Sequence, residues 1–136
     1  MPGYLLDTNI VSETRRSRPN PGVVDFFTAA DKDALYLSVL TVGELHKGVE
    51  ARRRSDPAAA SLLADWARGI ELDFADRILP IDLAAARHWG LLSAARTCPT
   101  VDTLIAATAL ERGLTLVTRN ERDFQFTGVT LLNPWK

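Results

Sequence analysis

The chain has 136 residues, 46% of them hydrophobic, so it is long enough to bury one core and suggests a single domain. Its 16 Lys and Arg residues nearly balance 17 Asp and Glu residues, so the totals do not indicate a strongly basic nucleic-acid binder, although local patches remain compatible with them. The single cysteine, Cys98, excludes an intrachain disulfide and a zinc cluster of thiolates. No stretch resembles a signal peptide or approaches the length of a membrane span, and we expect a cytoplasmic location.

The first half of the chain alternates short apolar runs with helical patterns. GYLLDT (3–8) predicts a buried strand, and NIVSETRR (9–16) predicts one or two helical turns that end at the break SRPNPG. Pro21 can open a helix through VVDFFTAAD. ALYLSV (34–39) predicts a second strand, and TVGELHKGVEARRR (41–54) predicts an amphipathic helix.

The second half of the chain continues this alternation. Its patterns predict helices over residues 58–76, 82–96 and 100–113, strands over 77–81, 114–118 and 129–134, and a turn with a short helix over 119–124. Gly113 is expected to end its helix. Strands that alternate with helices indicate an α/β fold with a mostly parallel central sheet flanked by helices.

Four acids lie where a strand passes into a helix or in the first turns of a helix. Asp7 ends the first strand, Glu44 and Asp102 lie in the first turns of their predicted helices, and Asp123 follows LTLVT. Ligands of open parallel sheets bind outside the carboxyl ends of the strands, where such passages converge. Carboxylates crowded there repel one another unless a cation or a proton compensates, and Mg²⁺ prefers oxygen ligands. The acids therefore predict a metal-dependent site for a phosphate-containing substrate.

Each acid also has a simpler interpretation as a group that stabilises a helix start. Asp7 can cap the helix that follows it. Thr41 and Glu44 have the spacing of a capping box, and residues 120–123 have a similar spacing. Asp102 favours the positive end of a helix dipole. The shared topological position of the four acids favours the functional interpretation.

The ordered motifs resemble a known family. LLDTNIVSE, LSVLTVGELHKGVE, VDTLIAATALERGLTLVTRNERDF and the terminal LLNPWK are similar to PIN-domain ribonucleases of the VapC type, including the FitB-like members, which are the toxin halves of toxin–antitoxin pairs. The resemblance runs from Tyr4 to Trp135. It implies one PIN domain over residues 1–136, folded as a PIN-like three-layer sandwich.

The resemblance also implies the composition of the site. Asp7, Glu44, Asp102 and Asp123 would form a catalytic acidic pocket that binds Mg²⁺ or Mn²⁺. The supporting polar groups would be Thr8, Asn9, Thr118 and Asn120.

The chain offers no convincing protein nucleophile. Cys98 lies in a turn before Pro99, and His46 and His88 lie within helical patterns. A water activated by metal is the simplest attacking group, and it would leave RNA with 5′-phosphate and 3′-hydroxyl ends because this attack needs no ribose 2′-hydroxyl. Arg119 and Arg122 are candidates to hold RNA phosphates. For the arginine run 52–54 we prefer a solvated charged face, and Arg15, Arg16 and Arg18 form a further basic group.

The resemblance implies a homodimer and a cognate antitoxin whose tail covers the acids, with DNA contacted only through the antitoxin and no membrane partner. Three other functions would place different demands on the sequence. An interaction module without catalysis would share the fold, but all four matched acids are present. A phosphatase with an aspartate nucleophile, of the haloacid-dehalogenase type, requires a second Asp where this chain has Asn9. A nuclease acting on DNA or flaps would share the chemistry and differ in substrate.

Overall fold

The computed structural model describes residues 3–136, and within them five strands form one sheet in the order β3–β2–β1–β4–β5. Every pairing is parallel, including Tyr4 with Leu35 between β1 and β2, and Tyr4 with Thr115 between β1 and β4. The predicted, mostly parallel sheet is confirmed. The strands are β1 (Tyr4–Leu6), β2 (Leu35–Ser38), β3 (Ile78–Leu79), β4 (Thr115–Val117) and β5 (Leu131–Leu132).

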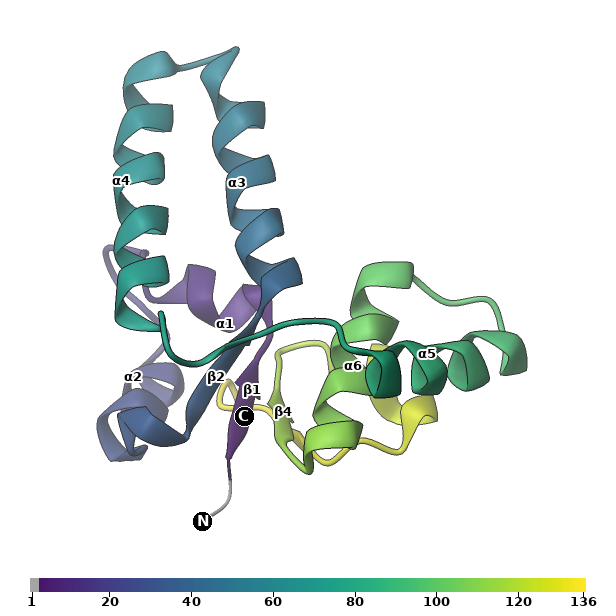
Figure 1. Ribbon diagram of the computed structural model, residues 1–136. Coiled ribbons are helices and arrows are strands. Elements are labelled where there is room, and N and C mark those ends of the chain that lie inside the picture. Colours follow the sequence, from purple (N-terminus) through teal and green to yellow (C-terminus); the bar gives the residue numbers. More distant parts are fainter. Residues whose placement is uncertain (1–2) are drawn as a thin grey trace.

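Helices connect these strands and cover both faces of the sheet (Figure 1). A long hairpin of α3 and α4 projects well beyond the strands, while α5 and α6 pack against each other on the other side. None of the helices in residues 3–136 is long and apolar enough to cross a membrane. The α-helices are α1 (Thr8–Glu13), α2 (Pro21–Ala29), α3 (Val39–Arg53), α4 (Pro57–Asp73), α5 (Leu83–Ala95), α6 (Thr100–Arg112) and α7 (Glu121–Phe124), and the 3₁₀ helices are η1 (Lys32–Ala34) and η2 (Gln125–Thr127).

The three layers follow from the alternation of side chains along the strands. Leu6 and Leu37 pack on one face with residues of α1 to α4, such as Ile10. Leu5 and Leu116 pack on the opposite face with residues of α6 and α7, such as Ile105 and Phe124. A sheet with apolar clusters on both faces requires helices on both sides, and this confirms the predicted sandwich.

The structure corrects the predicted start of one helix. α3 begins at Val39 rather than at Thr41, because the Ser38 side chain accepts a hydrogen bond from the Leu40 N–H at 3.0 Å and so caps the helix. Glu44 therefore lies in the second turn of α3, and its predicted position in the first turn was wrong.

The strand predicted over 77–81 is also shorter than expected. β3 ends before Pro80, which has no N–H to donate to a neighbouring strand.

Candidate active site

Asp7 lies at the carboxyl end of the central strand of the sheet. β2 and β3 follow on one side of β1, whereas β4 and β5 lie on the other, so the chain direction across the sheet reverses between β1 and β4. Ligands of open α/β sheets bind at such topological switch points. The Asp7 side chain is 5% exposed, so this carboxyl group is buried at the place where the fold favours a ligand.

Three neighbouring residues hold the Asp7 carboxylate. Its Oδ1 accepts the Thr8 N–H at 2.8 Å, which makes Asp7 the cap of α1. Its Oδ2 accepts the Thr118 hydroxyl at 2.8 Å and the Asn9 side-chain amide at 3.3 Å. The cap interpretation is confirmed, and the same contacts fix the carboxylate at the sheet edge. Capping and a role in the site are therefore compatible for this residue.

The loop after β4 is tied to the same carboxylate. The buried Thr118 hydroxyl accepts the backbone N–H of Asn120 at 3.0 Å, and the side-chain oxygen Oδ1 of Asn9 accepts the backbone N–H of Arg119 at 3.4 Å. The Asn120 side chain is exposed and makes no capping hydrogen bond to α7, so the interpretation of residues 120–123 as a cap was wrong. The structure thus places Asn9 and Thr118 directly on Asp7, whereas Asn120 joins them through its backbone.

Glu44 reaches this region from α3. The Thr8 hydroxyl donates a short hydrogen bond of 2.5 Å to Glu44 Oε1 and lies 3.3 Å from the Thr41 hydroxyl. Thr41 is fully buried inside α3, so the capping-box interpretation of Thr41 and Glu44 was wrong. Thr41 is a neighbour of the site that the sequence analysis assigned only to capping, because the true cap is Ser38. Glu44 is therefore free to face the beginning of α1.

The electrostatics link all four acids. The pKa of Asp7 is raised to about 6, chiefly by burial. The hydrogen bonds from Thr118 and Thr8 lower this pKa, and the nearby charges of Asp102 and Glu44 raise it. Burial also raises the pKa of Asp102, in the first turn of α6, and the charges of Glu44 and Asp123 add to this effect. Asp123 is exposed on α7 and is connected to the group through Asp102. The four predicted acids therefore lie close enough for their charges to influence one another.

The donor atoms fit a hard divalent cation. Carboxylate and hydroxyl oxygens surround the switch point. Burial and, to a smaller extent, like charges raise the pKa values of Asp7 and Asp102, and a cation would lower both. No three His, Cys, Asp or Glu side chains within residues 3–136 are already close enough to share one ion. Mg²⁺ is usually held by one or two carboxylates and keeps several waters, so this arrangement suits it. Asp7 and Asp102 are the residues that could hold the ion.

The remaining candidates lie around this centre or away from it. The Arg119 guanidinium lies 5.5 Å from the centre of the Trp135 ring, and Arg122 is exposed on α7. His46 is exposed on α3 and pairs with Glu71 at 3.2 Å, and His88 is half-buried on α5 and pairs with Glu111 at 2.8 Å. Both histidines therefore lie within helices, as predicted. Cys98 is half-buried in the turn before α6.

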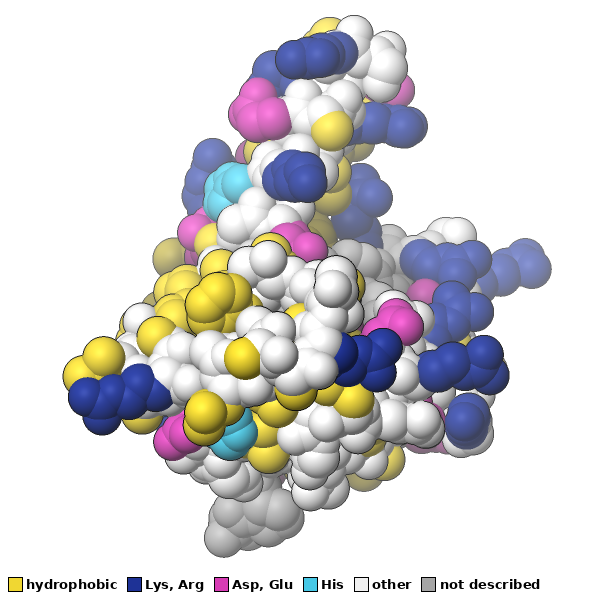
Figure 2. All heavy atoms as spheres, turned by 90° about the vertical axis from the view of Figure 1, so that its right-hand side faces the viewer, with side chains coloured by type: hydrophobic (Ala, Val, Ile, Leu, Met, Phe, Trp, Pro, Cys, Tyr) yellow, Lys and Arg dark blue, Asp and Glu magenta, His cyan; other side chains and the backbone are white. Residues whose placement is uncertain are grey.

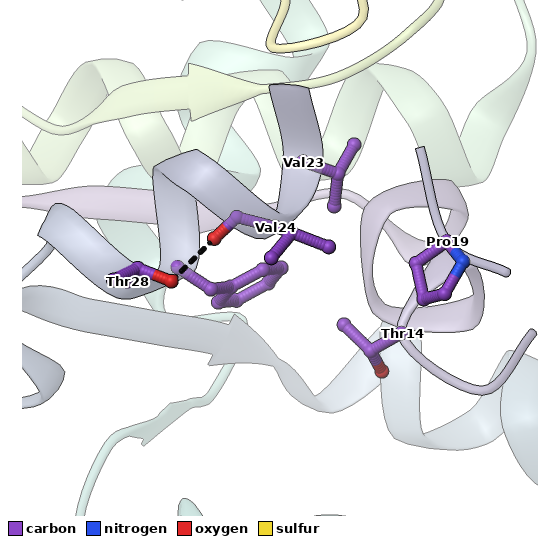
Figure 3. Close-up of a pocket in the computed structure, with 6 residues that line it drawn as sticks. Thr14, Pro19, Val23, Val24 and Thr28 are labelled. Atoms are coloured by element: carbon purple, nitrogen blue, oxygen red, sulfur yellow. Dashed lines mark hydrogen bonds between the residues drawn. The ribbon is translucent and has the colours of Figure 1, made fainter. Parts of the chain in front are cut away.

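A separate apolar cavity of about 300 Å³ lies between the end of α1 and α2 (Figure 3). Thr14 and Pro19 face Val23 and Val24 across it, and the Thr28 hydroxyl donates to the Val24 carbonyl at 2.8 Å. The residues that line it include no charged side chain. The cavity is distinct from the acidic centre and offers no group for acid–base chemistry.

The fold and the site together define a three-layer α/β protein with a buried acidic centre at the switch point of a parallel sheet. Comparison with known proteins identifies the class further. The PIN domain matches residues 4–128. The chain is 38% identical over 136 residues to the toxin FitB of Neisseria gonorrhoeae, covering 96% of this chain and 97% of FitB. It is 35% identical over 140 residues to the VapC ribonuclease Y4jK of Sinorhizobium fredii, covering 97% of each.

A solved structure of FitAB bound to an IR36 DNA fragment superposes with a TM-score of 0.87, at 32% identity, covering 98% of this chain and 96% of the other. The chain therefore belongs to the PIN-domain family, in the group that contains VapC ribonucleases and the FitB toxin. The sequence-based resemblance is confirmed.

Proposed function

We propose that this protein is a Mg²⁺- or Mn²⁺-dependent endoribonuclease that acts in the cytoplasm as the toxin of a type II toxin–antitoxin pair. The single observation that carries the proposal is the buried Asp7 at the switch point, electrostatically joined to Asp102 and Glu44. Membership of a group that contains VapC ribonucleases supports RNA as the substrate. The products would carry 5′-phosphate and 3′-hydroxyl ends.

The residues of the chain have distinct roles in this mechanism. Asp7 and Asp102 would hold the cation, while Glu44 and Asp123 complete the pocket directly or through water. Thr118 and Asn9 fix the Asp7 carboxylate, and Thr8 fixes Glu44. When bound, the cation lowers the pKa of water and neutralises charge on the scissile phosphate. Asn120 would orient a carboxylate or a bound water. Arg119 and Arg122, which are exposed, would hold RNA phosphates.

A cognate antitoxin is the second part of the proposal. The similar solved structure is of FitAB bound to a DNA fragment. This supports a partner of this chain that is an antitoxin and makes the contacts with DNA. We expect this chain to form a homodimer within that complex. Co-expression with the product of an adjacent small open reading frame should yield a stable complex on affinity purification, and failure of every such product to co-purify would count against the pairing.

The proposed activity is tested by mapping RNA ends after expression of the wild type and the Asp7→Asn variant. We expect new 5′-phosphate ends only with the wild type, and cleavage by purified protein should require Mg²⁺ or Mn²⁺ and stop in EDTA. Asp25→Asn, a change of an exposed acid on α2, is the matched control and should cleave as the wild type does. Full cleavage by Asp7→Asn would show that another group is the centre of the site.

A further inference from the structure

A cavity of about 320 Å³ lies where the end of α1 meets the α3–α4 hairpin. Two arginines, Arg15 and Arg52, line it together with Gly48 of α3 and with Ala59 and Leu63 of α4. It is therefore a basic cavity with one small apolar wall, and no acidic side chain lines it. Its position differs from both the acidic centre and the apolar cavity beside α2.

The cavity lies on the same stripe of α3 as the acidic centre. Glu44, Gly48 and Arg52 follow one another at intervals of four residues, so they share one helix face. Eight residues of helix place Arg52 about 12 Å beyond Glu44. Gly48 has no side chain, so the helix face between Glu44 and Arg52 is open. Even a Cβ added at Gly48 would meet nothing within 4 Å. An extended molecule could therefore pass along this face from the acids to Arg52.

Helix α1 forms the second side of this path. Its first residue, Thr8, bonds to Glu44, and Arg15 lies just beyond its last residue and lines the cavity with Gly48. α1 thus runs along α3 from the acidic centre to the cavity. The acidic centre and the basic cavity have opposite charge. This suits an RNA strand with one phosphate held by a cation at the acids and another held by guanidinium groups in the cavity.

The charged side chains next to Arg15 and Arg52 in the sequence already have partners within the protein. Arg16 pairs with Glu13 at 3.4 Å, and Arg53 pairs with Glu50 at 3.1 Å. The Asp56 side chain caps α4 by accepting the Ala59 N–H at 3.1 Å. Within residues 3–136, no carboxylate lies within 4.0 Å of a side-chain nitrogen of Arg15 or Arg52. Figure 2 shows Lys and Arg side chains on the projecting arm of the molecule.

We propose that this cavity binds a backbone phosphate of the RNA strand whose scissile phosphate lies at the acidic centre. The inference rests on the proposed ribonuclease function. It specifies the path that the bound RNA strand takes from the acidic centre along the protein surface. Guanidinium groups bind phosphate oxygens through paired hydrogen bonds. Two of them, one from the turn after α1 and one from α3, define one phosphate position. All three arginines of the run 52–54 are exposed, as predicted. Arg53 pairs with Glu50, whereas Arg52 lines the cavity.

The test compares Arg15→Gln and Arg52→Gln with Arg53→Gln as the matched control from the next position of the same helix. Binding of a labelled single-stranded RNA of about ten nucleotides is measured by fluorescence anisotropy in EDTA, which stops the proposed cleavage. We expect Kd to rise roughly threefold to tenfold for each cavity variant, and the slope of log affinity against log salt to fall by about 0.7 per arginine. Arg53→Gln should bind as the wild type does, and all variants should unfold at the wild-type temperature.

Equal affinities for all proteins would overturn the phosphate site, and so would an equal loss in Arg53→Gln, which would indicate diffuse charge. A polyglutamate peptide that binds through the same two arginines more tightly than the RNA would assign the cavity to an acidic protein segment instead. The proposed function fails separately if the wild type generates no RNA ends. Cleavage by the wild type together with unchanged RNA affinity of the cavity variants would refute only the further inference.

Discussion

At the scale of single residues, Asp7 shows a conflict between stability and the proposed function. An ordinary Asp has a pKa of 3.8, and burial raises the pKa of Asp7 to about 6. The charged form is therefore disfavoured in the folded protein. A difference of two pKa units corresponds to about 3 kcal/mol between the two protonation states. Strongly shifted carboxyl pKa values cluster at functional sites, and this supports a cation site at Asp7 in addition to its role as a helix cap.

Replacement of Asp7 by Asn should therefore stabilise the metal-free protein. Because the folded pKa lies above the unfolded pKa, the contribution of Asp7 to stability is fully present below about pH 4 and is lost as pH rises through about 6. In EDTA near pH 7.5 we expect Asp7→Asn to unfold with a free energy about 1–3 kcal/mol higher than the wild type, and near pH 4 the difference should vanish. Urea denaturation at both pH values measures this, with Asp25→Asn as the control. A difference that is the same at both pH values would show that the charge of Asp7 is not its cause.

At the scale of elements, the C-terminal segment holds the loop that follows β4. Asn133 donates its side-chain amide to the Arg119 carbonyl at 3.2 Å and accepts the Trp135 N–H at 3.0 Å. Trp135 packs on the apolar cluster of β1 and α2. The last residues of the chain thus position the loop whose N–H groups bind Thr118 and Asn9. The LLNPWK segment therefore positions the loop after β4, which is part of the site, although the segment contains none of the four acids.

Gly22 should be the sensitive point of this contact. A Cβ at Gly22 would lie 2.0 Å from the Pro134 carbonyl oxygen, so Gly22→Ala must displace either α2 or the C-terminal segment. We expect a loss of about 1–3 kcal/mol in the free energy of unfolding, together with weaker RNA cleavage. Gly69→Ala is the matched control, because its Cβ would meet nothing within 4 Å of its place in α4, and it should stabilise by about 0.5–1 kcal/mol. Both free energies can be measured by urea denaturation. Similar values for the two variants would contradict the contact.

Local sequence signals predicted the kinds of elements more successfully than their ends. Pro21 and Gly113 mark helix ends through their own conformational preferences: α2 begins at Pro21, and α6 ends just before Gly113. The start of α3 was missed because both Ser38 and Thr41 are good caps, and only the position of β2 in the sheet decides between them. The role of Thr41 beside Thr8 depends on a contact across 33 positions of sequence. Periodicity contains no information about such a contact.

At the scale of the whole molecule, the acidic centre depends on the order of the strands. Asp7 and Thr118 are 111 positions apart, and they meet because β1 and β4 are neighbours at the switch point. The alternating pattern predicted a parallel sheet, and the ordered motifs suggested which acids converge. Neither could predict the projection of the α3–α4 hairpin or the cavity at its base, because these features depend on how helices distant in sequence pack.

A protein whose acids converge only in the folded state should be stabilised by the cation that it is proposed to bind. A ligand that binds only the folded state at 100 times its Kd stabilises by about 2.7 kcal/mol. We expect Mg²⁺ or Mn²⁺ to raise the unfolding temperature of the wild type and of Asp25→Asn, but not that of Asp102→Asn. The gain should shrink below about pH 6, where Asp7 becomes protonated and competes with the metal. Differential scanning fluorimetry across pH measures each effect. An equal rise in Asp102→Asn would indicate a general salt effect, whereas no rise in any protein would favour an interaction module without catalysis.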